Sequence, residues 1–599
     1  MCGIVGYIGK NNIKEKLLYG LGELEYRGYD SAGIVVIEDK KTSIYKSVGK
    51  LQTLIEKSKE FETKAFGVGI GHTRWATHGK PTEENAHPHL GENSFVVHNG
   101  IIENYMEIKE SLQKDGVHFK SQTDTEVIVH LFEKLLKQSS DHLEAFTKTL
   151  EKLKGAFALL LVNKDRPKSI YFAKKGSPLI LGRGDEGVYF GSSDAALIGH
   201  ASEVIYLEDG DFGVLSQEEI IFFRNSSPIN PAFKPLTLSR QSAQKEGYRY
   251  FMEKEIYEQH TILADTVMGR VLGDKIFFEE LEEEFLEGID EIKICACGTS
   301  YHAALAGSYL LERYARLSTK VEIASEFRYK EPIMKKNELF VVISQSGETA
   351  DTLEALKMAK EAGLKTLAIC NVDNSSIVRL ASRTILTRAG IEKGVASTKA
   401  FATQMMVLWM LSLFFAQKQK AGFIKNEIQN IYEAIKITKL SDKLHQKLKR
   451  LSKRYLHGHG FFFIGRDIFY PLALEGALKL KEISYLHAEG YPSGEMKHGP
   501  IALADSELFT IGLLPKNLLH EKSKSNLEEL SARDATILAI TPVDLEIADD
   551  FIKTTKSSSY MVEFFEMMVI VQVLALEISV RLGNDVDMPR NLAKSVTVE

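Results

Sequence analysis

The second half of the chain repeats one pattern, and this repetition limits the possible folds more than any other feature of the sequence. Each copy passes from an apolar segment through a glycine or hydroxyl-rich turn into an amphipathic segment, which is typical of a doubly wound parallel sheet. Four segments recur in the same order about 170 residues apart: IKICACG and FFFIG, LFVVIS and LFTIGL, LEAL and LEEL, and LAIC and LAIT. We therefore predict two α/β domains with parallel sheets that arose by duplication.

A different pattern precedes the repeat. Short alternating or apolar runs such as GIVVI, SFVVHNG and FALLLV are separated by Gly and Asn turns, with few helical stretches besides 125–137, which predicts an α+β sheet domain. Three of the 14 prolines stand at 228, 231 and 235, before a polar stretch, and indicate a linker. The predicted boundaries are 2–223 for the α+β domain, 224–247 for the linker, 248–440 and 441–589 for the α/β domains, and 590–599 for a C-terminal tail.

Charge and composition argue against several classes of protein. Lys plus Arg number 75 and Asp plus Glu 81, a net charge of −6, so the chain has no basic excess for a nucleic-acid backbone. The longest apolar run, 405–416, is shorter than the about 20 residues that span a bilayer. The N-terminus lacks a secretory signal, and four cysteines with no zinc spacing fit a reducing compartment. We expect a cytoplasmic protein without a membrane or nucleic-acid partner.

Cys2 directly follows the initiator methionine. Removal of that methionine would leave a cysteine with both a thiol and a free α-amine. The reference pKa of such an amine, about 7.7 to 8.0, would let it take the thiol proton near neutral pH. On position alone, a buried cysteine without a catalytic role is an equal alternative.

Other motifs in the first half supply groups that suit a polar substrate. GHTRWATHG contains Arg74, whose guanidinium matches a ligand carboxylate. Asn99 and Gly100 end an apolar run, where a side-chain amide and a backbone N–H could face an oxyanion. Asp124 stands at the start of a predicted helix. We expect it to be exposed enough to accept from a substrate ammonium, although it could simply cap the helix.

Five of the 17 histidines lie between positions 72 and 98. His87 and His89 have H-x-H spacing, but the carboxylates nearby show no helical spacing to them. We therefore expect structural or ligand-orienting histidines and no metal site.

Together MCGIVG, EYRGYDSAG, GHTRWATHG, NAHPH, VVHNGIIEN and SQTDTEV resemble the N-terminal-nucleophile hydrolase domain of class II glutamine amidotransferases. The resemblance implies that Cys2 attacks the side-chain amide of L-glutamine with its own α-amine as base, and that Asn99 and Gly100 form the oxyanion hole. The glutamine-binding residues that it implies are Arg74 for the carboxylate, Asp124 for the ammonium, Thr77, His78 and His87 in the pocket, and Trp75 as its cover and the gate of an ammonia path.

Three hydroxyl-rich turns in the first α/β copy indicate a phosphate site. CGTS, SQSGET and VASTK each open a predicted helix, and the N–H groups and dipole at a helix N-terminus favour an anion. One such turn alone is usually a helix cap, whereas three in one domain favour a bound phosphate. The chain has no GxxxxGK[ST] loop for nucleotide phosphates. In the second copy the SQSGET position reads LLPKNL, without hydroxyls.

The second copy carries EGALKLKE, which places Glu475, Lys479 and Glu482 on one helix face. A surface stripe of ion pairs has the same spacing. Two carboxylates around an ammonium could also move protons between adjacent sugar carbons. His498 follows on a glycine-proline loop as a candidate acid or base for opening a sugar ring.

These motifs resemble paired sugar isomerase domains. With the glutaminase motifs and the ending DVDMPRNLAKSVTVE, the resemblance runs from residue 2 to 599 and is to amidotransferases that aminate D-fructose 6-phosphate. It implies the formation of D-glucosamine 6-phosphate and L-glutamate, internal ammonia transfer, no cofactor, and a homodimer.

The same resemblance implies roles in the sugar site. Glu482 is the base between C1 and C2 with Lys479 assisting, and Lys594 in the tail forms a Schiff base with the ketose. His498 opens the ring from the neighbouring subunit. The implied sugar-phosphate residues are Thr299, Ser300, Ser344, Gln345, Ser346 and Thr349, with Val395 and Ser397 lining the sugar.

Two other functions remain as alternatives. A different class II amidotransferase would need a diphosphate- or ATP-binding half, and a sugar-phosphate-binding regulator would need an effector such as a helix-turn-helix. Neither motif is found in the chain.

Overall fold

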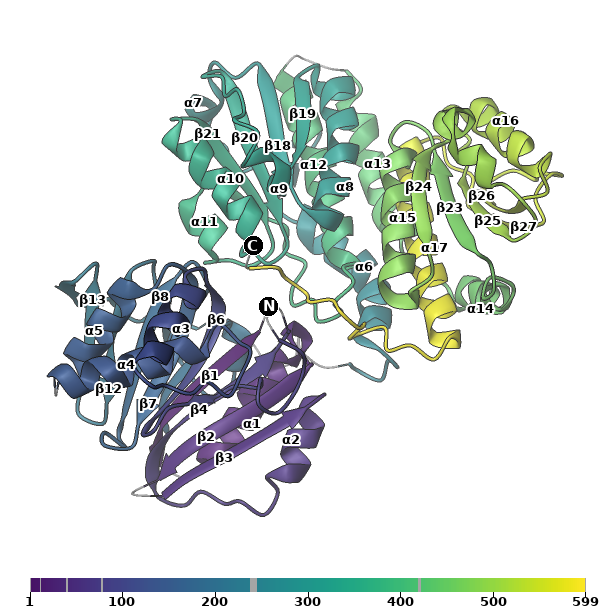
Figure 1. The fold of residues 1–599 in the computed structure, drawn as a ribbon. Coiled ribbons are helices and arrows are strands. Elements are labelled where there is room, and N and C mark those ends of the chain that lie inside the picture. Colours follow the sequence, from purple (N-terminus) through teal and green to yellow (C-terminus); the bar gives the residue numbers. More distant parts are fainter. Residues whose placement is uncertain are drawn as a thin grey trace. The chain divides into compact units, whose positions relative to one another are not determined.

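The computed structural model describes residues 2–10, 12–38, 41–76, 79–139, 141–236, 245–418 and 422–597. By its internal contacts the chain forms two units (Figure 1). The first comprises Met1–Ser242 and Ala593–Glu599, and the second comprises Ala243–Leu592. The predicted tail is therefore divided, since residues after 592 group with the N-terminal unit.

The N-terminal unit contains two antiparallel sheets. The first has the order β15-β11-β9-β10-β1-β4-β2-β3 and the second the order β14-β13-β12-β8-β7-β6-β5. The first sheet consists of β1 (Gly3–Lys10), β2 (Ser31–Glu38), β3 (Lys41–Val48), β4 (Phe66–Arg74), β9 (Ile180–Gly184), β10 (Gly187–Gly191), β11 (Glu203–Tyr206) and β15 (Lys234–Pro235). The second consists of β5 (His89–Leu90), β6 (Ser94–Ile102), β7 (Gly155–Asn163), β8 (Ser169–Lys175), β12 (Asp211–Ser216), β13 (Ile220–Arg224) and β14 (Ser227–Ile229).

The two sheets enclose one apolar core and are covered by helices on their outer faces. Ile4 and Val35 of the first sheet share a buried cluster with Val97 and Leu160 of the second. Separate clusters join the first sheet to α1 and α2, and the second to α4 and α5. The helices are α1 (Ile13–Leu24), α2 (Leu51–Lys57), α3 (Tyr105–Lys114), α4 (Glu126–Ser139) and α5 (His142–Lys152). The unit is a four-layer α-β-β-α sandwich, as the predicted hydrolase class requires.

We expected the proline cluster to mark a linker that begins at residue 224, but its first part is not a free linker. β14 pairs with β13, and β15 pairs with β11, so both segments extend the sheets. Pro228 and Pro235 occupy terminal strands of the two sheets, where a missing N–H costs no ladder hydrogen bond. Residues 237–244 of the predicted linker lie outside the described residues.

The second unit contains two five-stranded sheets, in which every strand pair is parallel. Their orders correspond: β19-β18-β20-β21-β22 and β24-β23-β25-β26-β27. The first consists of β18 (Glu291–Ala296), β19 (Ser318–Ile323), β20 (Glu338–Ser344), β21 (Lys365–Cys370) and β22 (Arg383–Leu386), and the second of β23 (Gly460–Gly465), β24 (Ala488–Pro492), β25 (Leu508–Leu513), β26 (Thr536–Thr541) and β27 (Asp550–Lys553). The four repeated segments take equivalent places, so the predicted duplication is confirmed.

Helices surround these sheets. A short hairpin of β16 (Val271–Leu272) and β17 (Lys275–Ile276) follows the first helix, α6. The helices are α6 (Phe251–Val267), α7 (Glu283–Leu286), α8 (Gly298–Leu310), α9 (Ala324–Phe327), α10 (Ala350–Glu361), α11 (Ser376–Leu380), α12 (Lys399–Lys418), α13 (Ile424–Ile437), α14 (Asp442–Leu451), α15 (Phe469–Ser484), α16 (His520–Ser531) and α17 (Tyr560–Arg581).

Helix α12 contains the longest apolar run and lies in the core of the second unit. By length and composition it could cross a membrane, but 94% of its most apolar 18-residue stretch is buried within the protein. Trp409 stacks on Phe565 of α17, with ring centroids 6.0 Å apart. An all-round apolar helix that is buried in this way is a core helix.

Candidate active sites

Cys2 lies at the start of β1, beside the end of β4. The next residue, Gly3, pairs with Thr73, which brings the Cys2 thiol to the backbone of Trp75. Cys2 Sγ accepts a hydrogen bond from Trp75 N at 3.2 Å. Burial raises the pKa of the thiol, although the Trp75 hydrogen bond and Arg74 oppose this effect. The thiol is therefore neutral at physiological pH and needs a base before it can act as a nucleophile.

Asn99 and Gly100 lie together on β6, next to Cys2. Asn99 Nδ2 donates to the Cys2 carbonyl oxygen at 2.9 Å. Gly100 has a φ of 136°, and a Cβ atom there would meet the oxygen of Ala156 at 1.9 Å. The position therefore requires glycine. The structure brings the predicted nucleophile and the predicted oxyanion-hole amide into one site.

Arg74 and Asp124, the predicted ligands for the two charged ends of glutamine, are both buried. Arg74 is 4% exposed at the end of β4, and its Nη2 donates to Gly79 O at 3.2 Å. Asp124 is 5% exposed, and its Oδ2 accepts from Ile102 N at 2.8 Å. We expected an exposed Asp124 at a helix start. Instead it precedes α4 and bonds the end of β6, so any substrate ammonium must reach it inside the fold.

The remaining predicted pocket residues have different positions. Trp75 is half-buried directly after β4. His87 is buried, and its ring stacks on that of His72 with centroids 4.0 Å apart. Burial holds the pKa of His87 well below its usual value, so the ring is neutral. Thr77 and His78 lie outside the described residues.

Within the described residues, one group has the spacing of metal ligands, and it lies elsewhere. Glu253, His445 and Glu577 hold their ligand atoms within 4.8 Å of one another. Arg249 Nη2 lies 2.6 Å from Glu253 and 2.5 Å from Glu577. Because this guanidinium already pairs with both carboxylates, we interpret the group as an ion-pair network.

In the second unit, two of the hydroxyl-rich turns meet at one sheet edge. β18 and β20 are parallel neighbours, so CGTS and SQSGET both follow the carboxyl ends of the strands. Ser344 Oγ lies 3.2 Å from Thr349 Oγ1 and accepts from Gly347 N at 3.0 Å. Gly347 has a φ of 66°, and a Cβ atom there would meet Ser375 Oγ at 1.9 Å. Hydrogen bonding and close packing thus hold this turn in one conformation.

The third turn is connected to the first through helix α12. Gln404 Nε2 donates to Ser300 Oγ at 3.0 Å, and Ser300 is 8% exposed. Val395 is buried, and its N–H donates to Asp587 O at 3.1 Å. Ser346 is buried, and Gln345 and Ser397 are half-buried. The first turn is therefore joined to the helix that the third turn opens.

Glu475, Lys479 and Glu482 lie on α15 as predicted, but they do not form a surface stripe. Glu475 and Lys479 have side chains 0% and 1% exposed. Lys479 Nζ lies 2.6 Å from Glu482 Oε2 and 3.2 Å from the hydroxyl oxygen of Thr299. Burial opposes the charge of Lys479, but Glu482 and Glu475 raise its pKa overall. A charged ammonium is therefore held between two carboxylates, next to the CGTS turn.

Glu475 is the most enclosed member of this network. Its Oε1 accepts from Thr299 at 3.0 Å, and its Oε2 lies 2.8 Å from His302 Nδ1. Burial disfavours its charge, but Lys479 and His302 lower its pKa overall. Thr299 and His302 belong to α8 of the first copy, so the network spans both copies of the repeat.

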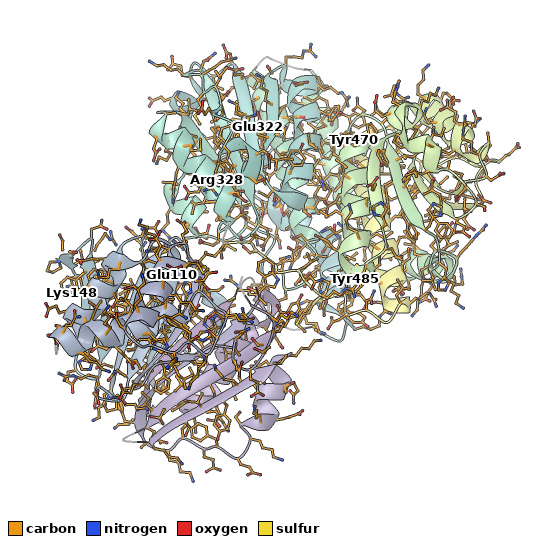
Figure 2. The ribbon with its side chains drawn as sticks, in the orientation of Figure 1. Glu110, Lys148, Glu322, Arg328, Tyr470 and Tyr485 are labelled. Atoms are coloured by element: carbon orange, nitrogen blue, oxygen red, sulfur yellow. The ribbon has the colours of Figure 1, made fainter. Side chains whose placement is uncertain are left out.

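The segment before the tail is anchored on the second unit. Asp587 accepts hydrogen bonds from Phe251 N and Met252 N, each at 2.9 Å. Tyr485, at the end of α15 (Figure 2), accepts from Arg590 N at 2.8 Å, and the Arg590 guanidinium lies 4.2 Å from its ring centroid.

The two remaining predicted catalytic residues are His498 and Lys594. His498 is exposed, at the end of the short helical segment Ser493–His498. Lys594 is half-buried and groups with the N-terminal unit. Ser595 and Thr597 beside it are 7% and 5% exposed, so this part of the tail is packed.

Comparisons with known proteins identify the kinds of domain that carry the two sites. A family model for a glutamine amidotransferase domain matches residues 72–199, and a model for the SIS domain matches residues 286–413 and 458–572. A Campylobacter jejuni protein named glutamine–fructose-6-phosphate aminotransferase (isomerizing) is 62% identical over 600 residues, covering 100% of both chains. The Helicobacter pylori protein of that name is 54% identical, again covering 100% of each chain. The chain belongs to this aminotransferase family.

A solved structure of one member supports the assignment of the second unit. The C-terminal domain of the aminotransferase from Francisella tularensis is 37% identical to this chain, with a TM-score of 0.55. The match covers 57% of this chain and 99% of the Francisella tularensis chain. The predicted resemblance to a class II amidotransferase with two sugar isomerase domains is therefore confirmed.

Sequence reasoning missed three contacts near these sites. His72, known only as one of five clustered histidines, bonds Asn99, while His302 bonds Glu475 and Gln404 bonds Ser300. Each partner is more than 25 residues away in the chain, so no local spacing could reveal it.

Proposed function

We propose that this chain converts L-glutamine and D-fructose 6-phosphate into L-glutamate and D-glucosamine 6-phosphate. The observation that carries the proposal is the coexistence of two distinct sites in one member of the family. Cys2 faces Asn99 in the N-terminal unit, and a buried Glu-Lys-Glu network adjoins a hydroxyl-rich sheet edge in the second. Nitrogen passes internally as ammonia from one site to the other.

In the glutaminase half, the thiol of Cys2 is the nucleophile. Its pKa is raised by burial, so the α-amine that is left when Met1 is removed takes the proton. The thiolate attacks the side-chain amide, and Asn99 Nδ2 and the Gly100 N–H stabilise the oxyanion. The α-ammonium returns its proton to the amide nitrogen, so that collapse of the tetrahedral intermediate expels ammonia and leaves a thioester. Water then hydrolyses the thioester to glutamate. Arg74, Asp124, Thr77, His78, His87 and Trp75 bind and enclose the glutamine.

In the isomerase half, hydroxyls at the sheet edge hold the sugar phosphate. The residues are Thr299, Ser300, Ser344, Gln345, Ser346 and Thr349, with Val395 and Ser397 beside the sugar. Glu482 moves the proton between C1 and C2, and the Lys479 ammonium lies 2.6 Å from its carboxylate. Lys594 forms an imine with the ketose carbonyl.

The exposure of His498 supports a role in the sugar site of a second subunit, where it opens the ring. This role requires a homodimer. We place the reaction in the cytoplasm because glutamine and phosphorylated sugars are intracellular substrates.

One assay tests the reaction directly. Purified protein with glutamine and fructose 6-phosphate should yield glucosamine 6-phosphate and glutamate in equal amounts. A different class II amidotransferase would release glutamate without an amino sugar phosphate, and a sugar-phosphate-binding regulator would form neither product.

A further inference from the structure

Four buried histidines lie behind the proposed oxyanion hole, and the reaction described above does not use three of them. His72 lies on β4, His98 on β6, and His87 and His89 at the start of β5 or just before it. All are between 1% and 4% exposed. Burial lowers the pKa of each ring, that of His72 to about 3. The histidines are therefore neutral, and each ring has one N–H donor.

His72 is the member of this group that contacts Asn99. Its Nε2 lies 3.0 Å from Asn99 Oδ1 and 3.1 Å from the carbonyl oxygen of His98. The backbone oxygen can only accept, so Nε2 must carry the proton. His72 Nδ1 is buried without a hydrogen-bond partner in the described part of the chain. An unpaired nitrogen lone pair is less costly there than an unpaired N–H, which favours the same tautomer.

The proton on His72 determines which way the Asn99 amide points. Asn99 Nδ2 donates to the Cys2 carbonyl oxygen at 2.9 Å. If the amide were rotated by a half-turn, its oxygen would face that carbonyl and its NH2 would face the His72 N–H. Both contacts would then be repulsive. The two neighbours thus select one orientation, in which the second N–H of Asn99 remains available for the oxyanion.

We propose that His72 is a positioning residue of the glutaminase site, which holds the Asn99 amide with its N–H toward the developing oxyanion. The inference rests on the proposed role of Asn99. His72 is not a candidate base for the thiol, because burial lowers the pKa of its ring to about 3 and makes the ring a poor proton acceptor. Stacking on His87 at an interplanar angle of 11° holds the ring in the plane that these two bonds require.

Three substitutions of His72 distinguish the loss of its hydrogen bond to Asn99 from the loss of its side-chain volume. His72→Gln can place an amide N–H near the position of Nε2. His72→Asn is polar but too short to reach Asn99, and His72→Met fills the space without a donor. We expect His72→Met and His72→Asn to lower the glutaminase kcat by about 10- to 100-fold, with KM for glutamine within about twofold of the wild type. His72→Gln should restore most of kcat.

A double-mutant cycle tests whether His72 acts through Asn99. Asn99→Ala alone should lower kcat by about 100-fold or more, and adding His72→Met or His72→Asn to it should cost less than about twofold further. Equal losses in both backgrounds, or a loss in His72→Gln as large as in His72→Met, would overturn the positioning role. If Asn99→Ala retains full kcat, the oxyanion role of Asn99 fails, and the His72 inference fails with it.

The second unit supplies the folding control. Each variant should keep the wild-type rate of ammonia-dependent synthesis from fructose 6-phosphate and the wild-type unfolding midpoint of the N-terminal unit. Should His72→Met unfold, the polar His72→Asn carries the same comparison. A fall in kcat that follows the unfolding midpoint across all three variants would mean that His72 is only structural.

Discussion

At the scale of single residues, the two sites treat charge in opposite ways. Burial keeps the Cys2 thiol and the neighbouring histidines neutral, whereas Lys479 and Glu475 remain charged although they are almost fully buried. A neutral thiol becomes a nucleophile after a single proton transfer to a base such as the α-amine. In the second site, the charged Lys479 ammonium instead lies beside the Glu482 carboxylate, which is the proposed proton acceptor.

Replacing Cys2 tests the separation of the two sites. Cys2→Ala should lower glutamine hydrolysis by at least about 1,000-fold, because it removes the nucleophile. Synthesis from free ammonia should continue, since the isomerase site lies in the other unit. Glutamate release and amino-sugar formation are measured separately. Cys295→Ala, which changes a buried thiol of β18, is the control and should keep both activities. Glutamate release by Cys2→Ala at the wild-type rate would exclude Cys2 as the nucleophile.

Sequence motifs identified the residues of the glutamine site but not their connections. Cys2, Arg74, Asn99 and Asp124 each stand in a short motif, and residue type indicates their chemistry. The bond from His72 to Asn99 joins β4 of one sheet to β6 of the other, and no periodicity along the chain records it. The burial of Asp124 could not be predicted for the same reason, because it results from the packing of segments that are distant in the sequence.

At the scale of elements, the repeat was predictable and its packing was not. Strand, turn and helix alternate along the chain. The sequence pattern therefore predicted both sheets and the helix face that carries Glu475, Lys479 and Glu482. The burial of that face depends on α15 packing against α8 and α17, which the spacing does not contain. The proline cluster was misread for a related reason, since a terminal strand and a linker both tolerate a missing N–H.

Glu475 tests the connection between the two copies of the repeat. Glu475→Gln removes a buried charge that faces Lys479, Thr299 and His302. Breaking a buried pair in this way should lower the unfolding free energy of the second unit by about 3 kcal/mol. Isomerase activity should fall at least about tenfold because Lys479 is then paired with only one carboxylate, Glu482, while glutaminase activity is unchanged. A Glu475→Gln enzyme with full isomerase activity would show that this carboxylate is not needed.

The Arg249 network predicts a pH-dependent contribution to stability. Glu577 on α17 bonds His445 of α14 and Arg249 before α6, and these partners overcome burial to lower its pKa to about 2. Because the pKa of Glu577 is lower in the folded state than in the unfolded state, its ionisation stabilises the folded state at pH values above the unfolded pKa of about 4.3. This contribution is lost as the pH falls toward 2.

Chemical denaturation of Glu577→Gln measures this contribution. The variant should be less stable than the wild type by a constant amount between about pH 5 and 7, and the difference should shrink below about pH 4. Glu326→Gln, at the short helix α9 outside the network, is the matched control. A difference between variant and wild type that does not change with pH down to the acid limit would contradict the assigned pKa.

At the scale of the whole molecule, the C-terminal segment is the part that belongs to both units. Asp587 and Arg590 bond the second unit, whereas Ala593 and the residues after it group with the first. From composition, the tail would be a frayed terminus, but Ser595 and Thr597 are buried. A tail that is ordered in this way is a suitable carrier for a reactive lysine.

Lys594 provides the test of that role. The lysine amine must be neutral to add to the ketose carbonyl, and the imine forms with loss of water. Lys594→Arg keeps the charge but cannot form the imine, so synthesis should fall by at least about 100-fold while glutaminase activity is kept at least in part. Borohydride with fructose 6-phosphate should reduce the imine to a stable amine, which mass spectrometry locates on Lys594 of the native protein.

The two readouts together decide whether Lys594 reacts or only packs. Lys556→Arg, at a lysine distant in sequence from the tail, is the control and should label and turn over like the native protein. A tail that only packs would let Lys594→Arg keep its synthase activity, and borohydride would then trap the sugar on neither protein. Equal labelling of the native protein and Lys594→Arg would place the imine on another lysine. A covalent link lost only with Lys594, together with the loss of synthesis, requires that the tail reach the sugar during turnover.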